Sequence, residues 1–423
     1  MPWTGRKLHL VGVGGAGMSG YARVALALGA EVSGSDRADS PALQALRDLG
    51  VTVHVGHDAA NVPAGADVFH SSAIAPDNPE RALGSRPRAD LLGELSALKR
   101  TIAVAGAHGK TTTTSMVAHV LLALGMDPAY LIGGDLTTTG RNADWGAGEW
   151  LVVEADESDR SMLALDVDVA VVTNVELDHH ATYASLAEVR EVFRQFLAGA
   201  PQAVLWDRPD VLALRDGPFV AFDAGASPFE WRGHLVMPGV PGAHNARNAA
   251  AALEAARLAG ADEAAAAMAV STFMGAGRRF QPLGHTASGA LVVDDYAHHP
   301  TEVAATIAAA RTLHPRRVVA LFQPHLFSRT ARLHREFGAA LAAADLVAVM
   351  DVYPARERPE DWPGVTGRLV AQAVADHGRQ PLWLPSHDDA VRVLAARLRE
   401  GDTVLVMGAG DVDRVGRALV GQG

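Results

Sequence analysis

The chain has 423 residues and a formal net charge of −11, and it is 48% hydrophobic but only 5% aromatic, with 42 glycines. This length exceeds what one hydrophobic core supports, so several domains are expected. The net negative charge gives no basic surface that would attract nucleic acid or anionic lipid. Because the sequence contains no cysteine, disulfides, zinc–thiolate sites and cysteine nucleophiles are excluded.

The amino-terminal sequence enters a strand-like run within a few residues and lacks the charged and apolar regions of a secretory leader. No apolar run reaches the roughly 18 residues that a membrane-spanning helix needs. The sequence therefore favours a cytoplasmic location, with no membrane and no nucleic acid as a partner.

Short apolar strands, glycine or polar turns and helices with small apolar residues alternate along the whole chain. This alternation predicts an α/β protein of three consecutive units, with boundaries at residues 1–98, 99–284 and 285–423. The first boundary follows a helical stretch, DLLGELSALKR, that precedes a new strand. The second unit ends after an Ala-rich helix that should stop at Gly260.

The first unit carries a glycine-rich turn. Its first strand runs into Gly12-x-Gly14-x-x-Gly17, and Asp36 ends the next strand. Such glycines let the backbone approach a diphosphate at the start of the following helix, and an acidic residue at this spacing is typical of dinucleotide sites. The turn therefore predicts nucleotide binding, with NAD as one version, and a turn that binds nothing is the alternative.

The second unit opens with the strongest single motif. A strand runs into Gly106, a tight turn carries Gly109-Lys110-Thr111, and a helix follows at once. Backbone N–H groups and the helix start can wrap an anion, while the lysine neutralises phosphate oxygens and the threonine ligates Mg²⁺. The Walker pattern requires a glycine where this chain has Val104. We therefore predict a shortened phosphate loop rather than an ordinary turn with a surface lysine.

Two further strands of this unit end in titratable groups, one at Glu154 with an acidic run behind it and one at Asp178-His179-His180. Ligands of such folds gather at the carboxyl edge of the sheet. Glu154 can hold Mg²⁺, and an imidazole beside a carboxylate can ligate a metal or orient a phosphate. A solvated acidic loop and structural histidines are the alternatives.

The end of the second unit offers amides and guanidinium groups. Asn245 and Asn248 follow His244 at the start of a helix, one turn apart on the same face. Asparagine amides can read an adenine edge or cap the helix. Arg278 and Arg279 stand near the junction to the third unit, where they can bridge to a phosphate or be surface charges.

The third unit opens with titratable groups clustered at a strand end, namely Asp294, Asp295, Tyr296, His298 and His299. Such density indicates a site. A helix cap made by aspartate and Thr301 is the alternative, but it leaves the paired histidines unexplained. Later strands are followed by His325 and Arg329, and by Tyr353 and Glu357.

Taken together, the motifs of this chain resemble those of the Mur ligase family. They occur in the family's order from Gly12 to Asp411, as GVGGAGMSG, AGAHGKTTTT, EADESDRS, TNVELDHH, PGAHNARNAA, GAGRRF, DDYAHHPTE, FQPHLFSRT, DVYPARE and GAGD. The resemblance implies a Rossmann-like first domain that binds a UDP-sugar, a central P-loop ATPase domain, and a Rossmann-like third domain that closes over the site on the amino-acid side.

The resemblance also implies roles for individual residues. On the UDP-sugar side it places Gly12, Gly14, Gly15, Ala16, Gly17, Met18, Ser19, Asp36, Ser71, Ser72, Ala73 and Ile74. At the ATP site it places Gly106, Ala107, His108, Gly109, Lys110, Thr111, Thr112, Asn245, Asn248, Arg279 and Asp295. The implied metal ligands are Thr111, Glu154 and His179, and the implied catalytic residues are Lys110, Glu154, His179 and His298. His325 and Arg329 would face the amino acid.

Three positions depart from the family pattern. Ala107 stands where threonine is usual, which removes one hydroxyl but leaves the backbone of the loop intact. His180 doubles a histidine that is usually single, so that either ring can be the one that meets the metal. Leu326 stands where some relatives carry arginine.

The activity that the resemblance implies is ATP-dependent ligation in peptidoglycan synthesis. L-alanine would be joined to the lactyl carboxylate of UDP-N-acetylmuramate through an acyl phosphate, with ATP and Mg²⁺ required. DDYAHHPTE and DVYPARE favour this branch over a sister ligase that adds a peptide to the same sugar. A nicotinamide-dependent oxidoreductase is the rival from another class, but it leaves the lysine loop unexplained.

Overall fold

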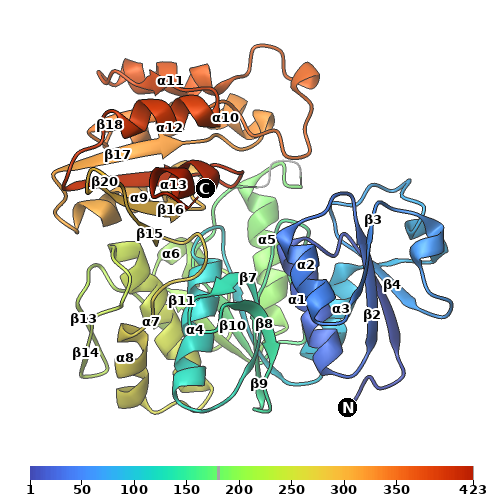
Figure 1. Ribbon diagram of the computed structural model, residues 1–423. Helices are drawn as coiled ribbons and strands as arrows, with labels where there is room; N and C mark the ends of the chain where they lie inside the picture. The colour runs from blue at the N-terminus through green and yellow to red at the C-terminus, as the bar shows by residue number, and fades with distance from the viewer. Residues whose placement is uncertain (179–181, 423) are drawn as a thin grey trace. The chain divides into compact units, whose positions relative to one another are not determined.

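The computed structural model describes residues 1–178 and 182–422 and contains three mainly parallel sheets in chain order (Figure 1). The chain divides into two compact units. The first comprises residues 1–224, 229–237 and 247–274, and the second comprises residues 225–228, 238–246 and 275–423. The first two sheets belong to the first unit and the third sheet to the second. The predicted class, three consecutive α/β folds, is confirmed.

The first sheet is parallel throughout, in the order β3-β2-β1-β4-β5. Its strands are β1 (Lys7–Val11), β2 (Glu31–Asp36), β3 (Thr52–Val55), β4 (Asp67–His70) and β5 (Arg86–Pro87). The helices are α1 (Ala16–Ala27), α2 (Pro41–Asp48) and α3 (Arg88–Ser96), with short 3₁₀ turns η1 (Ala59–Asn61) and η2 (Arg81–Leu83). All carboxyl ends of these strands share one edge, so the glycine turn, Asp36 and the segment after β4 meet there.

The second sheet has seven strands in the order β12-β11-β10-β6-β9-β7-β8, of which β8 alone is antiparallel to its neighbour. They are β6 (Arg100–Ala105), β7 (Ala129–Leu136), β8 (Arg141–Trp145), β9 (Trp150–Glu154), β10 (Val169–Val172), β11 (Gln202–Trp206) and β12 (Val220–Phe222). The associated helices are α4 (Lys110–Ala123), α5 (Leu186–Ala198), α6 (Pro209–Leu212), α7 (Ala243–Leu258) and α8 (Glu263–Ser271), with η3 (Ser161–Ala164) and the hairpin β13 (Phe229–Trp231) and β14 (His234–Val236).

The third sheet runs β15-β16-β20-β17-β18-β19, with β15 antiparallel and the others parallel. Its strands are β15 (Gln281–His285), β16 (Leu291–Asp295), β17 (Arg317–Phe322), β18 (Leu346–Val349), β19 (Leu382–Trp383) and β20 (Asp402–Met407). The helices are α9 (Pro300–Arg311), α10 (Phe327–Leu341), α11 (Gly367–Asp376), α12 (His387–Ala395) and α13 (Asp413–Leu419), with η4 (Pro359–Asp361). The strand β15 covers residues 281–285, so the third sheet begins before the boundary that was expected between residues 284 and 285.

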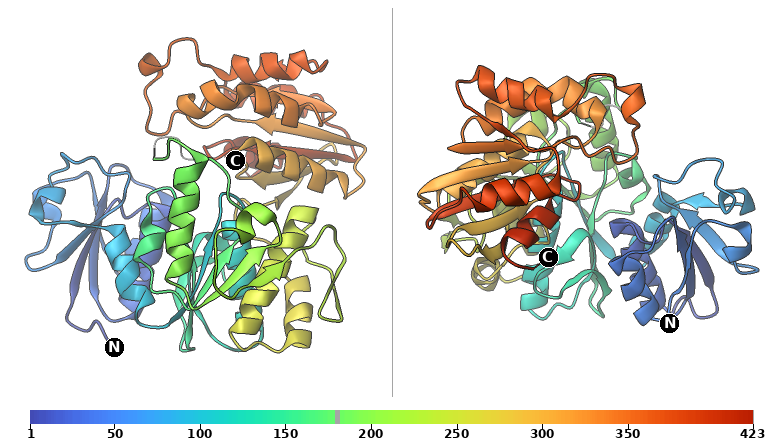
Figure 2. Two further views of the ribbon diagram at one scale, coloured as in Figure 1. Left: turned by 180° about the vertical axis from the view of Figure 1, so that it is seen from behind. Right: turned by 45° about the horizontal axis from the view of Figure 1, so that its top comes forward.

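Strand sequences explain how the third sheet is covered. Along β17, Val318, Ala320 and Phe322 face one apolar core with α9, α10 and α11, whereas Val319 and Leu321 face a second core with α12 and α13. Helices therefore lie on both faces of this sheet (Figure 2). A strand buried on both sides must be apolar almost throughout, which is why RVVALF and DTVLVM lack the alternation of a half-exposed strand.

Helix boundaries follow local chemistry. Ser185 accepts a hydrogen bond from the Glu188 N–H and so begins α5, and Asp262 caps α8 in the same way. Gly260 follows α7 with φ of +96°, the left-handed conformation expected where a helix ends. No helix among the described residues is both long and apolar enough to cross a membrane.

Candidate functional site

The phosphate loop predicted from the sequence connects β6 to α4. Gly106 and Gly109 have φ of +143° and +81°, and α4 begins at Lys110. A side chain at Gly106 would collide with Thr173 at the end of β10, so glycine is required there. The Asn174 amide fixes the turn, since its Oδ1 accepts from the His108 N–H at 2.9 Å and its Nδ2 donates to the His108 carbonyl at 2.8 Å.

Lys110 is held at the start of α4 by oxygen atoms. Its Nζ donates to the Gly106 carbonyl at 2.5 Å and to Glu157 Oε1 at 2.9 Å. Burial alone would lower the pKa of Lys110, but the carboxylates of Glu157, Asp156 and Glu154 outweigh it and raise the pKa well above its ordinary value. The lysine is therefore a permanent cation at the amino end of a helix, the arrangement that a polyphosphate requires.

Thr111 and Glu154 meet beside this lysine. Thr111 Oγ1 donates to Glu154 Oε1 at 3.1 Å, and the Gly133 N–H donates to Glu154 Oε2 at 2.8 Å. The hydroxyl and the carboxylate are both oxygen donors, which is the ligand type that Mg²⁺ takes. Two of the three expected metal ligands thus lie together, and the third, His179, lies outside the described residues, as does its neighbour His180.

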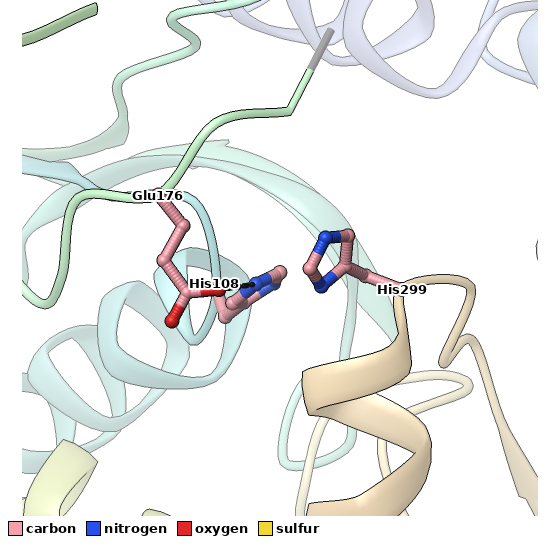
Figure 3. Close-up of side chains that lie close together, drawn as sticks. All are labelled: His108, Glu176 and His299. Carbon is pink, nitrogen blue, oxygen red and sulfur yellow. Dashed lines mark hydrogen bonds and ion pairs between the residues drawn. The ribbon is translucent and has the colours of Figure 1, made fainter. Parts of the chain in front are cut away.

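Glu176 contacts the phosphate loop, which its position in the sequence did not predict. His108 Nε2 lies 3.2 Å from Glu176 Oε2, so the loop after β6 and the segment after β10 are tied together (Figure 3). The two residues are 68 positions apart, and only the pairing of β6 with β10 brings them close. Glu157 was likewise not separated from its acidic neighbours, although it is the direct partner of Lys110.

The two asparagines of α7 have different surroundings. Asn248 lies against the phosphate loop, because a Cβ added to Gly109 would be 2.5 Å from Asn248 Oδ1. Asn245 belongs to the other unit and donates from Nδ2 to the Pro241 carbonyl at 2.7 Å. Both side chains lie within α7, which begins at Ala243, so neither is the residue that caps this helix.

Hydrogen bonds to β2 and to Asp36 hold the glycine turn of the first sheet. Gly12 has φ of +83°, and the N–H groups of Gly12 and Val13 both donate to the Ser35 carbonyl. Asp36 Oδ2 accepts from the Gly14 N–H at 2.9 Å, so this carboxylate shapes the turn itself. Ile74 and Ser71 lie against the same turn, each 3.2 Å from the position a Gly12 Cβ would take.

The expected residues of the third sheet form a second group. Burial raises the pKa of Asp295 to about 6, although Arg279 opposes the shift, and this carboxylate accepts from the N–H groups of Phe280 and Ala297 at 2.8 Å each. The His298 ring lies 6.2 Å from the His325 ring, and Arg329 Nη1 lies 3.4 Å from His325 Nδ1.

Two contacts in this unit differ from those expected from the sequence. The expected alternative to a site was a cap made by aspartate and Thr301, but the cap of α9 is His299, which shares a capping box with Glu302. Arg278 is not a free surface charge, since it pairs with Asp294 at 3.0 Å and donates to the carbonyls of Gly408 and Gly410. Arg279 lies 3.8 Å from Glu302.

Family models cover most of the chain. Residues 7–103 match the Mur ligase family catalytic domain, residues 104–217 match the Mur ligase middle domain, and residues 278–410 match the Mur ligase glutamate ligase domain. These three stretches follow the order of the three sheets.

Full-length relatives extend the match. The chain is 44% identical to a UDP-N-acetylmuramate–L-alanine ligase of Rubrobacter xylanophilus, over 98% of this chain and 99% of the relative. It is also 44% identical to the enzyme of the same name from Thermobifida fusca, over 98% and 96%.

Solved structures are similar over the same length. A UDP-N-acetylmuramate-alanine ligase from Thermotoga maritima superposes with a TM-score of 0.83 at 28% identity, covering 98% of both chains. A murein peptide ligase from Psychrobacter arcticus, at 24% identity and a TM-score of 0.71 over 99% and 98% of the chains, shares the fold.

Proposed function

Because this chain belongs to the Mur ligase family, we propose that it is the ATP-dependent ligase that joins L-alanine to the lactyl carboxylate of UDP-N-acetylmuramate in peptidoglycan synthesis. ATP is converted to ADP and phosphate in this reaction. The observation that carries the assignment is the match to L-alanine ligases at 44% identity over almost the whole chain. The buried Lys110 at the start of α4 supports the ATP-dependent half of the reaction.

The chemistry explains why ATP is needed. A carboxylate resists attack by an amine because oxide would have to leave. Transfer of the γ-phosphoryl group to a carboxylate oxygen gives an acyl phosphate and ADP. The alanine amine then attacks the acyl carbon, the tetrahedral intermediate loses its proton to a base, and phosphate leaves as the amide forms. Phosphoryl transfer depends mainly on positioning and charge neutralisation.

We assign the ATP phosphates to residues 106–112, with Lys110 as the neutralising cation. Lys110 Nζ lies 2.9 Å from Glu157 Oε1, and the ATP phosphate oxygens would share this cation with Glu157. Asn248, which lies against Gly109, and Asn245 would serve the adenine side. Arg279 and Asp295 would contribute to the nucleotide from the other unit.

Thr111 and Glu154 are the residues that would hold Mg²⁺, together with His179. Their hydroxyl and carboxylate oxygens suit this cation. When bound, Mg²⁺ supplies charge neutralisation to the phosphate oxygens. The chain itself supplies the backbone N–H groups of the loop and the fixed cation of Lys110.

We propose that the sugar nucleotide binds at the carboxyl edge of the first sheet. Its diphosphate would meet Gly12 and Gly14 to Ser19, while Asp36 and Ser71 to Ile74 would line the rest of the site. The contact of Ile74 and Ser71 with the glycine turn supports one continuous surface. NAD has no role in this reaction.

His325 and Arg329 would face the incoming amino acid or its carboxylate. For the base that takes the amine proton we favour His298 over His299 within the described residues, because the His299 ring is engaged as the cap of α9. The His298 Nδ1 atom lies 3.0 Å from the Tyr296 carbonyl oxygen and 3.3 Å from Glu302 Oε2, and these contacts fix the orientation of the ring.

We also propose that the chain works as three parts, 1–98 for the UDP-sugar, 99–284 for ATP and 285–423 for the amino acid. The three sheets support a division into three parts, but the pairing of β15 with β16 moves the second boundary from 284/285 to before residue 281.

The first test is a requirement assay. ADP formation should need UDP-N-acetylmuramate, Mg²⁺ and L-alanine together, because the acyl phosphate forms only on the sugar carboxylate and is discharged only by an amine. We expect steady-state ADP formation to fall to background when any one of the three is omitted, because turnover then stops at or before the acyl phosphate. Coupled ADP detection measures this directly.

The same assay separates the rivals. A panel of L-alanine, L-serine, glycine and a tripeptide, each with UDP-N-acetylmuramate, distinguishes the alanine ligase from the sister ligase. Turnover with the tripeptide but not with L-alanine would overturn the assignment, and so would hydride transfer between NAD and a hydroxy acid in the absence of ATP.

A further inference from the structure

The turn between β17 and α10 has a strained backbone. Leu326, the residue before α10, has φ of +70° and ψ of +133°. Residues with a side chain rarely adopt this conformation, whereas glycine enters it without steric cost. Such strain persists only where the surrounding structure holds it in place. The strained residue lies between His325 and Arg329, the two residues assigned above to the amino acid.

Backbone contacts with the loop after β18 hold one side of this turn. The Leu326 N–H donates to the Tyr353 carbonyl at 2.9 Å, and the Tyr353 N–H donates to the Pro324 carbonyl at 2.8 Å. The Tyr353 ring stacks on the His325 ring, with centroids 5.8 Å apart. Because β17 and β18 are adjacent and parallel, the loops that follow them leave the same edge of the sheet. The loop after β18 is therefore placed to hold the strained turn.

A carboxylate from the same loop supplies the cap that α10 lacks. Leu326 occupies the cap position, and its apolar side chain accepts no hydrogen bond. Glu357 accepts from the Ser328 N–H at 2.9 Å with one oxygen and from the Ser328 hydroxyl with the other. A cap normally comes from the residue that precedes the helix, but here it comes from a residue 29 positions away. Glu357 therefore fixes the first turn of α10, to which Arg329 belongs.

We propose that Glu357 is a positioning residue for the amino-acid site. By holding the strained turn at Leu326, it fixes His325 and Arg329 in the orientation that the amino acid needs. The inference rests on the function proposed above, to which the amino-acid role of these two residues belongs. Arg329 Nη1 lies 3.4 Å from His325 Nδ1, so a shift of the turn changes both. Without Glu357 the turn would relax to an unstrained conformation and misplace the pair.

Other roles of Glu357 give different results. A cap that only stabilises α10 lowers the melting temperature when it is removed, but it leaves kcat/KM of the folded protein unchanged. A direct ligand of the amino acid's ammonium group acts through its charge, so glutamine cannot replace it. A positioning residue acts through hydrogen bonds, and glutamine can supply both. Its oxygen accepts from the Ser328 N–H, and its amide nitrogen donates to the Ser328 hydroxyl.

Steady-state kinetics of the full chain with varied L-alanine, at saturating UDP-N-acetylmuramate, ATP and Mg²⁺, test the proposal. Glu357→Ala should lower kcat/KM for L-alanine by about tenfold or more, because misplaced positioning groups cost at least this much. Its affinities for UDP-N-acetylmuramate and a non-hydrolysable ATP analogue, measured by titration calorimetry, should stay unchanged. Glu357→Gln should restore most of the lost kcat/KM. Asp361→Asn is the matched control: Asp361 pairs with the exposed Arg358 at 3.1 Å, and its loss should change none of these values.

A second pair of variants tests the strain itself. Leu326→Gly lets the turn keep its conformation without steric cost, so the turn depends less on the carboxylate. When Glu357→Ala is added to Leu326→Gly, kcat/KM for L-alanine should fall by less than about threefold, whereas it falls by about tenfold or more in the unaltered chain. A difference of this size is typical of residues that act in one network.

The proposal is overturned by an unchanged kcat/KM for L-alanine in folded Glu357→Ala, or by an equal loss in Glu357→Gln. A parallel loss of affinity for the ATP analogue, or an equal effect of Glu357→Ala with and without Leu326→Gly, also overturns it. Should Glu357→Ala not fold, Ser328→Ala removes the hydroxyl contact, and an unchanged kcat/KM for L-alanine in that variant contradicts the proposal. Failure of the unaltered chain to use L-alanine would instead remove the proposed function, and this inference with it.

Discussion

Replacing Lys110 with methionine should lower ADP formation by ~10³-fold or more, the scale seen when a cation that stabilises phosphoryl transfer is removed. Methionine keeps most of the apolar stem but cannot neutralise phosphate oxygens. The affinity for UDP-N-acetylmuramate in the absence of ATP should change by less than about threefold, or about 0.7 kcal/mol, because Lys110 lies in the loop after β6 whereas the sugar nucleotide is assigned to the first sheet. Steady-state kinetics and titration calorimetry measure the two effects.

A folding defect must be separated from this catalytic loss. Lys110→Met removes the cation that lies 2.9 Å from Glu157 Oε1, a side chain that is 3% exposed, and breaking a buried ion pair costs on the order of 3–5 kcal/mol. The double variant Lys110→Met/Glu157→Gln removes both charges and should recover much of the stability but none of the activity. Recovery of turnover in the double variant would show that Lys110 acts only by holding Glu157.

Thr111→Val and Thr113→Val form a second, matched pair. Thr111 Oγ1 contacts Glu154 at 3.1 Å, whereas Thr113 Oγ1 is buried and has no hydrogen-bond partner in residues 1–178 and 182–422. Both changes exchange a hydroxyl for a methyl in the first turn of α4. Thr111→Val should lower turnover by ~10–100-fold, as loss of a metal-site interaction does, and raise the Mg²⁺ concentration needed for half-maximal rate.

Thr113→Val should leave turnover unchanged and increase the free energy of unfolding, because a buried hydroxyl without a partner is destabilising. Magnesium titrations of both variants test the pair. Equal losses in the two would mean that the first turn of α4 is merely sensitive to threonine loss. An unchanged Mg²⁺ dependence in Thr111→Val would remove this residue from the metal site.

Much of the fold follows from sequence periodicity. Strands buried on both faces, such as TIAVA and RVVALF, stand out as short apolar runs between glycine turns and helices, so three α/β units could be predicted. The strand β15 could not. Its sequence, QPLGH, contains proline and glycine and pairs with β16 across an irregular register between Pro282 and Gly284, so that neither alternation nor β propensity marks it.

The site was predictable where a residue acts within a local motif. Lys110, Thr111 and the glycine turn are defined by the strand and helix on either side of them. Glu157 could not be chosen over Asp156 and Asp159, because the loop conformation decides which carboxylate reaches Lys110. Glu176 meets His108 only through the pairing of β6 and β10. His299 caps α9 in place of the usual serine, threonine or aspartate.

The central claim is that the sugar carboxylate is activated as an acyl phosphate and then captured by L-alanine. The most direct measurement follows oxygen-18 from the lactyl carboxylate of labelled UDP-N-acetylmuramate. Attack by that carboxylate on the γ-phosphorus must leave one labelled oxygen in the inorganic phosphate that is released, with the other retained in the amide product. Mass spectrometry of phosphate and product should find this distribution in each turnover. Phosphate without the label, formed together with the alanyl product, would contradict the account.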